Sequence, residues 1–132
     1  MTHLRALHHV QLGIPAGTEE TCRAFWSGVL GCEEIDKPPE LARRGGCWFR
    51  AGSMEVHLGV EADFHPSAKA HPGILVGDLP GLARRLEGSG VAVVWDSSFP
   101  GFERFYCADP VGNRLEFMES SADPAGGAVG SG

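Results

Sequence analysis

The sequence predicts an α+β domain built from two βαβββ modules, and an internal repeat is the main reason. His9 and His71 lie 62 residues apart, His57 and Glu116 lie 59 residues apart, and the residues around each pair follow the same pattern. Each half also contains one helical apolar stripe followed by three strand-like segments. We therefore expect one domain over residues 1–119, with modules at about residues 7–60 and 69–119.

Each module opens with a short strand that begins at a histidine. After His9 the apolar residues recur at every second position, and the same holds after His71. Side chains alternate between the two faces of a strand, so both histidines point away from the aliphatic face.

A helix follows each opening strand. In the first module Thr18 is the expected N-cap, and in the second module Asp78 takes this role. The first apolar stripe consists of Cys22, Phe25, Trp26, Val29 and Leu30, and the second consists of Leu79, Leu82, Ala83 and Leu86. We expect both stripes to cover a sheet, with Phe25 and Trp26 in the core.

Three further strands complete each module. They are expected at residues 33–35, 47–50 and 54–60, and again at 91–95, 104–107 and 114–118. His57 and Glu116 each lie between two apolar neighbours that point to the opposite face. Whether Trp48 or Phe49 faces the polar side depends on a register that the sequence leaves open. The eight strands are expected to form a cupped, mostly antiparallel sheet around a metal-binding cavity.

Four metal-competent side chains, His9, His57, His71 and Glu116, share the polar face of these strands. Imidazole and carboxylate are ligands of divalent transition metals, and chance would scatter such residues over both faces. The pattern predicts a site for Fe, Ni, Zn, Mn or Co. His57 is the least constrained member, because it can also contact a substrate or hydrogen-bond a water.

Three more polar residues share the predicted face. They are Gln11, Glu55 and Arg114, which we expect to line a substrate pocket. His8 and His65 fall outside the pattern and are expected to be structural or exposed.

Composition excludes several classes of partner. The net charge is −6 and no basic run occurs, which argues against nucleic acids and anionic membranes and leaves small molecules. Four cysteines without C-x-x-C spacing indicate reduced thiols, and with no apolar run near 20 residues we expect a cytoplasmic protein. Residues 120–132 are too poor in large apolar groups to fold and are expected to form a flexible tail.

Three segments resemble the vicinal oxygen chelate superfamily, which includes glyoxalase I, extradiol dioxygenases and the fosfomycin and bleomycin resistance proteins. They are His8-His9-Val10, Phe25-Trp26-Ser27-Gly28-Val29-Leu30-Gly31 and the final Asp109-Pro110-Val111-Gly112-Asn113 turn that leads to Glu116. The resemblance covers roughly residues 7–119. It implies a metal-dependent enzyme, and often a homodimer in which the two modules pair within one chain or are exchanged between chains.

The resemblance also implies roles for single residues. His9, His71 and Glu116 correspond to family ligands, and Glu116 is the expected catalytic proton carrier. Glyoxalase I typically carries Glu where this chain has His57. We expect a glyoxalase-like lyase or isomerase that binds adjacent substrate oxygens. The alternatives are an Fe(II) extradiol-type dioxygenase, an epoxide-opening resistance enzyme and a drug-sequestering binder.

Overall fold

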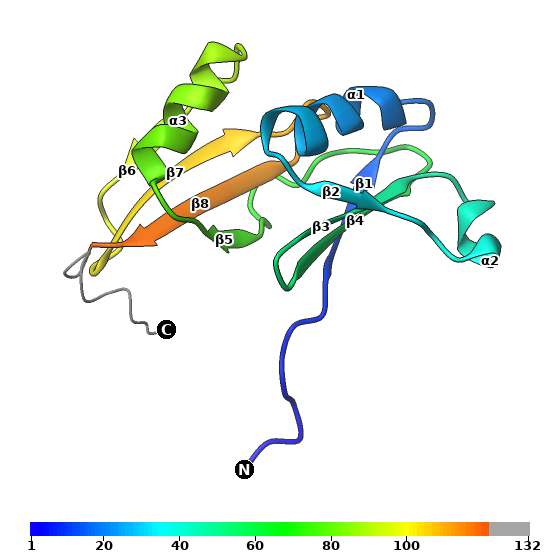
Figure 1. The fold of residues 1–132 in the computed structure, drawn as a ribbon, viewed down its shortest axis with the longest axis horizontal. Helices are drawn as coiled ribbons and strands as arrows, with labels where there is room; N and C mark the ends of the chain where they lie inside the picture. Colours follow the sequence, from blue (N-terminus) through cyan, green and yellow to red (C-terminus); the bar gives the residue numbers. More distant parts are fainter. Residues whose placement is uncertain (122–132) are drawn as a thin grey trace. The chain divides into compact units, whose positions relative to one another are not determined.

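The computed structural model describes residues 1–121, which form two compact units (Figure 1). Unit 1 contains Met1–Pro66 and the turn Pro110–Asn113, and unit 2 contains Ser67–Asp109 and the chain from Arg114 onward. Each unit has the βαβββ order, so the predicted pair of modules is confirmed. The tail prediction for residues 122–132 lies outside the described residues.

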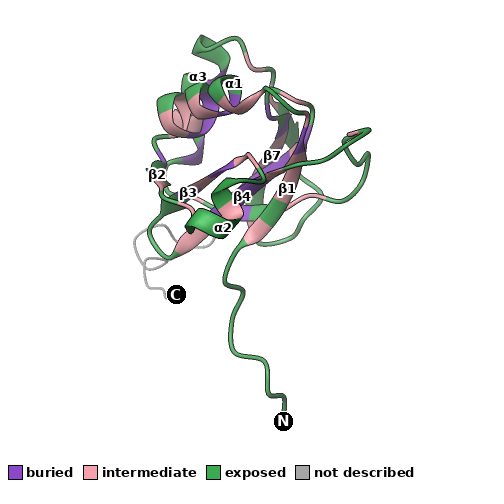
Figure 2. Cartoon of the chain, turned by 90° about the vertical axis from the view of Figure 1, so that its right-hand side faces the viewer, coloured by how far each residue is buried: buried purple, intermediate pink, exposed green. Residues whose placement is uncertain are grey.

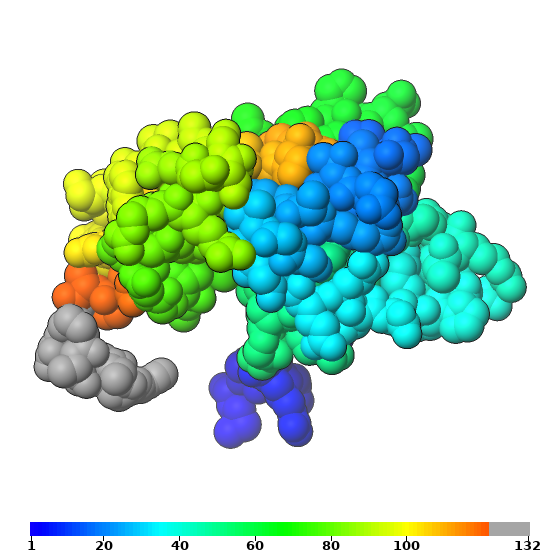
Figure 3. Space-filling model, turned by 45° about the horizontal axis from the view of Figure 1, so that its top comes forward, coloured from blue at the N-terminus to red at the C-terminus, as the bar shows by residue number. Residues whose placement is uncertain are grey.

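Unit 1 is a four-stranded mixed sheet with a helical segment on one face. Its elements are β1 (Val10–Ile14), α1 (Glu19–Arg23), a π-helical turn η1 (Ala24–Val29), β2 (Glu33–Ile35), α2 (Pro39–Ala42), β3 (Cys47–Ala51) and β4 (Met54–Val60). The strand order is β1-β4-β3-β2, in which β1 and β4 run parallel and the other neighbours run antiparallel. The helical segment and the following chain through α2 form one continuous surface of this unit, blue to cyan in Figure 3.

The start of the first helix differs from the expectation. The Thr18 side chain makes no capping hydrogen bond to the helix. Its hydroxyl donates instead to the Pro15 carbonyl, 2.7 Å away, in the turn before the helix. From Ala24 the helix widens, since the amide of Leu30 bonds the carbonyl of Phe25 five residues back. The wider turn still buries Phe25, as predicted.

The core of unit 1 settles the register that the sequence left open. Phe49 pairs with Val56 and is fully buried, with its ring 6.4 Å from that of the equally buried Trp26. Burying an aromatic ring of this size contributes about 2–3 kcal/mol. Trp48 pairs with His57 and therefore lies on the opposite, polar face of the sheet.

Unit 2 repeats this plan. Its elements are β5 (Gly73–Leu75), α3 (Leu79–Gly88), β6 (Val94–Asp96), β7 (Phe102–Ala108) and β8 (Arg114–Ser120), with strand order β5-β8-β7-β6 and a parallel β5–β8 pair. Buried residues follow the central strands, including β4 in unit 1 and β7 in unit 2 (Figure 2). Phe105 and Phe117 are register partners whose rings lie 5.7 Å apart. Asp78 caps α3 as predicted, because its Oδ1 accepts from the Gly81 amide.

Some strands begin later than expected. β5 starts two residues after His71, and β1 starts directly after His9, so both histidines precede their strands. β6 starts at Val94 rather than Val91, because the amide of Val91 is used to bond the last turn of α3 at the Leu86 carbonyl.

All four cysteines are buried, and no disulfide joins them in residues 1–121. Burial raises the pKa of the Cys47 and Cys107 thiols to about 11. None of the helices in this range is both apolar enough and long enough to span a bilayer.

Candidate functional site

The four predicted metal ligands divide equally between the units. His9 and His57 belong to unit 1, and His71 and Glu116 belong to unit 2. Within residues 1–121, no set of three or more His, Cys, Asp or Glu side chains is grouped to hold a metal ion. The four-ligand set therefore remains a prediction, and each pair is described within its own unit.

In unit 1, His57 lies in the middle of a stack of three rings. Its imidazole is 3.8 Å from the Trp48 ring at an interplanar angle of 6°, and 3.9 Å from the His9 ring at 14°. Trp48 reaches this position because it is the register partner of His57 on the neighbouring strand. Two nearly parallel imidazoles direct their ring nitrogens side by side, so His9 would have to turn for both residues to bind one ion.

A carboxylate completes the polar face of unit 1. Nε2 of His57 lies 2.9 Å from Oε1 of Glu55, and the Arg50 guanidinium lies 3.4 Å from Oε2. The hydrogen bond from His57, followed by the one from Arg50, lowers the pKa of Glu55 below its ordinary value. Glu55 therefore stays a carboxylate at neutral pH, on the face where the sequence placed it.

His8 joins this group, although its expected direction was away from it. Its Nδ1 lies 2.9 Å from Nδ1 of His9, which requires a proton on one of the two nitrogens. Because both residues precede β1, the alternation of a strand does not constrain them. Partial desolvation, followed by the imidazoles of His57 and His8, lowers the pKa of His9.

Gln11 follows on β1 and is exposed. Its amide lies over Gly59, where any side chain would collide with it. Because this amide is the end of a flexible, exposed side chain, a side chain at position 59 would displace it.

In unit 2, His71 and Glu116 form a direct pair. Nε2 of His71 lies 3.0 Å from Oε1 of Glu116, a side chain that is 7% exposed. Nδ1 of the same ring lies 2.7 Å from the Lys69 carbonyl. A neutral imidazole has one proton and cannot donate to both acceptors.

This arrangement fits a divalent cation. If Nδ1–H donates to Lys69, the lone pair on Nε2 faces the Glu116 carboxylate, and a proton or cation must lie between them. Two ligands at about 2.1 Å from an ion and at a right angle lie about 3.0 Å apart. A backbone carbonyl on the second nitrogen is also the usual orienting partner of a metal-bound histidine.

Arg104, which the sequence analysis did not single out, holds the other oxygen of Glu116. Its Nη1 lies 2.9 Å from Oε2 of Glu116, and its Nη2 lies 3.3 Å from Oδ1 of Asp96. Hydrogen bonds from Ser98, together with Arg104, lower the pKa of Asp96. The guanidinium thus fixes the orientation of the Glu116 carboxylate and leaves Oε1 to His71.

Tyr106 is the second residue that sequence reasoning missed. It pairs in register with Glu116, and its ring lies 5.3 Å from that of His71 in an edge contact. The guanidiniums of Arg104 and Arg114 lie 5.2 Å and 4.2 Å from the same ring. Alternation along β7 provided a usable signal, since Arg104 and Tyr106 alternate with the buried Phe105 and Cys107.

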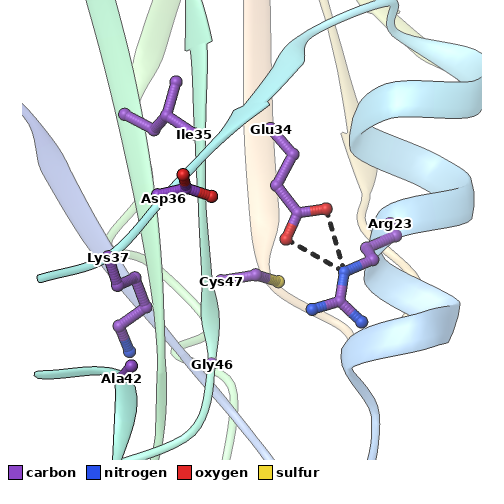
Figure 4. A pocket seen from close by; sticks show the side chains of 8 residues that line it. All are labelled: Arg23, Glu34, Ile35, Asp36, Lys37, Ala42, Gly46 and Cys47. Atoms are coloured by element: carbon purple, nitrogen blue, oxygen red, sulfur yellow. Dashed lines mark hydrogen bonds and ion pairs between the residues drawn. The ribbon is translucent and has the colours of Figure 1, made fainter. Parts of the chain in front are cut away.

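An open pocket of about 450 Å³ lies elsewhere in unit 1 (Figure 4). Its cations already have partners, because Arg23 bonds Glu34 and Glu20, and Lys37 bonds the Gly45 carbonyl. None of the predicted site residues lines it, and it gives no support to a substrate site.

Solved structures provide the comparison. A glyoxalase family protein from Bacillus anthracis is 44% identical, with a TM-score of 0.88, over 92% of this chain and 99% of that one. A lactoylglutathione lyase from Agrobacterium tumefaciens is 21% identical, with a TM-score of 0.68, over 89% and 96%. A glyoxalase/dioxygenase from Nostoc punctiforme is 18% identical, with a TM-score of 0.73, over 89% and 92%. No protein-family model and no curated protein matches the chain.

Two βαβββ units of this kind define the vicinal oxygen chelate fold, which the resemblance implied and the distant structures share. At 44% identity over almost the whole length of both chains, the first relative shows the family. The chain belongs to the glyoxalase family.

Proposed function

We propose that this chain is a divalent-metal-dependent, glyoxalase-like lyase or isomerase that acts on a small substrate through two adjacent oxygens. The observation that supports this best is the His71–Glu116 pair, with Nε2 and Oε1 3.0 Å apart and Nδ1 directed at a backbone carbonyl. Family membership supports the reaction class. We propose His71 and Glu116, with His9 and His57 from unit 1, as the residues that hold the ion.

When bound, the ion would act as a Lewis acid and stabilise negative charge on the substrate oxygens. The chain itself supplies the proton transfer. Glu116 would be the base that moves a proton between neighbouring carbons, and the hydrogen bond from Arg104 to Oε2 orients its carboxylate. Glu55, kept ionised by His57 and Arg50, is a second carboxylate that can contact the substrate together with Gln11.

Elemental analysis of the purified protein tests the metal site. We expect about one equivalent of transition metal per chain, and His71→Ala and Glu116→Gln should weaken its binding at least about tenfold. His65→Ala is a matched control, because its Nδ1 lies 2.8 Å from the carbonyl two residues back, as in His71. In residues 1–121 no carboxylate pairs with His65. Metal content that is the same in all four proteins would refute the site.

Turnover tests the reaction. The hemithioacetal of methylglyoxal and glutathione should be isomerised with Ni or Zn, without oxygen uptake. Activity that requires Fe(II) and consumes oxygen on catechols would instead assign a ring-cleaving dioxygenase. Metal-independent binding of an antibiotic without turnover would assign a sequestering protein.

The proposal includes a homodimer in the cytoplasm. Large apolar side chains of unit 2 are exposed, namely Leu75 and Val94 at the outer strands of its sheet, and burying them against a second copy would be favourable. Mixing His9→Ala and Glu116→Ala proteins tests a site shared between chains. Activity should return only if the ligands of one site come from two copies.

A further inference from the structure

The structure carries an unusual cation beside the proposed metal pair. The guanidinium of Arg114 lies 4.2 Å from the centre of the Tyr106 ring, close enough for the ring to hold it by cation–π attraction. A guanidinium held over a ring in this way keeps N–H groups available for hydrogen bonds to an anion.

The charge on Arg114 has no acidic partner in residues 1–121. Its Nη1 donates a long hydrogen bond, 3.4 Å, to the Ala68 carbonyl. Arg104, on the neighbouring strand, contrasts with it, because two carboxylates neutralise that residue. A guanidinium has five N–H donors, so most of those on Arg114 are free to bind an anion.

The position of this cation relative to Glu116 follows from the strand. Arg114 and Glu116 are two residues apart on β8 and lie on the same face, which places them about 7 Å apart along the strand. Tyr106, the register partner of Glu116, contacts both the Arg114 guanidinium and the His71 ring. An oxyanion on Arg114 would therefore have its attached carbons close to the Glu116 carboxylate.

We infer that the substrate is a small anion, with a carboxylate or phosphoryl group bound by Arg114 on the Tyr106 platform. The adjacent oxygens on which the reaction takes place would then lie toward Glu116. This inference rests on the proposed function for the reaction, but the anion site rests on Arg114 and Tyr106 alone. The inference therefore excludes neutral carbonyl compounds as substrates.

Tyr106 provides a direct reporter, because it is the one tyrosine of the chain. The full-length protein with ¹³C-labelled tyrosine is titrated with inorganic phosphate or propionate at constant ionic strength. We expect a saturable shift of the ring signals with at least one of these two anions. The anion that binds more tightly shows whether the site prefers a phosphoryl group or a carboxylate. Propionamide, which matches propionate in shape but has no charge, should produce no such shift.

Variants then assign the effect to one side chain. Arg114→Gln should weaken the anion affinity about tenfold or more, and Arg114→Lys should recover part of it, since a charge-assisted contact needs the cation and the fork geometry adds to it. Arg84→Gln, at an exposed arginine of α3, should leave the affinity unchanged. Circular dichroism and thermal unfolding confirm that each variant is folded.

The inference is overturned if the wild type shows no saturable shift, if Arg114→Gln binds as tightly as the wild type, or if propionamide binds equally well. Elemental analysis of the same samples separates it from the proposed function. Retained metal without anion binding overturns this inference alone, and anion binding in a protein that holds no metal overturns the proposed function alone.

Discussion

Replacing Arg104 by Met tests whether this residue holds the proposed base in place. The ion pair between Arg104 and Glu116 is mostly buried, with side-chain exposures of 15% and 7% and a separation of 2.9 Å. Removing one member of a buried pair costs about 3–5 kcal/mol, because the other charge is left without a partner. His71 remains beside Glu116, so we expect a smaller loss of about 2–3 kcal/mol.

The assay is urea and thermal unfolding followed by near-ultraviolet circular dichroism. For a chain of this size the loss corresponds to a decrease in Tm of about 6–12 °C. Glu116→Gln should cost less, about 1 kcal/mol, because Arg104 keeps its pair with Asp96. Arg84→Met is the control for loss of an exposed arginine and should change stability by less than about 0.5 kcal/mol.

The double variant Arg104→Met/Glu116→Gln decides the interpretation. If the two side chains pair in solution, the double variant should be more stable than the sum of the single losses predicts, with a coupling energy of about 1–2 kcal/mol. A coupling energy indistinguishable from zero would show that Arg104 does not orient Glu116, and the reasoning about the base would fail.

Two further predictions concern stability. Gly46→Ala should destabilise the protein by at least about 2 kcal/mol more than Gly17→Ala, because both glycines have φ near +80° but only at Gly46 would the new side chain collide with the Leu58 carbonyl. Equal losses in urea unfolding would contradict the packing at Gly46. Burial raises the pKa of Cys47 and Cys107 to about 11, above the value of about 8.5 in an unfolded chain. The folded protein therefore favours the protonated thiols. The stability that this provides is complete below about pH 8.5 and is lost as the pH rises toward 11. Urea unfolding from pH 7.5 to 10.5 should show this decrease in the free energy of unfolding. In the double variant Cys47→Ala/Cys107→Ala the free energy should fall less steeply with pH. An equal dependence on pH in the variant and the wild type would contradict the role of the two thiols.

Most of the fold was predictable because the relevant signals are local. Three such signals are the alternation after His9 and after His71, the stripe through Phe25 and Trp26, and the cap at Asp78. Each depends on neighbours within a few residues. The π-helical turn at Ala24–Val29 was not predicted, since the apolar stripe alone does not distinguish it from an α-helix.

The candidate site was predictable in part. Alternation placed Glu55 on the same face as His57 in unit 1, and the structure has the two side chains in contact. In unit 2 it placed Glu116 on the face opposite its apolar neighbours, where its register partner is Tyr106. Arg104 and Tyr106 were missed. Alternation along β7 indicates the face on which they lie, but their roles arise from cross-strand neighbours that the sequence does not show.

Within the strands and helices, the sequence by itself determined which residues share a face, because the periods of these elements are properties of the backbone. Only the tertiary structure decided the partners: which strand lies next to which, that His57 stacks between Trp48 and His9, and that Arg104 takes one oxygen of Glu116 and leaves the other to His71. Pairings of this kind join residues distant in the chain, and they are set by sheet register and side-chain packing rather than by any local pattern.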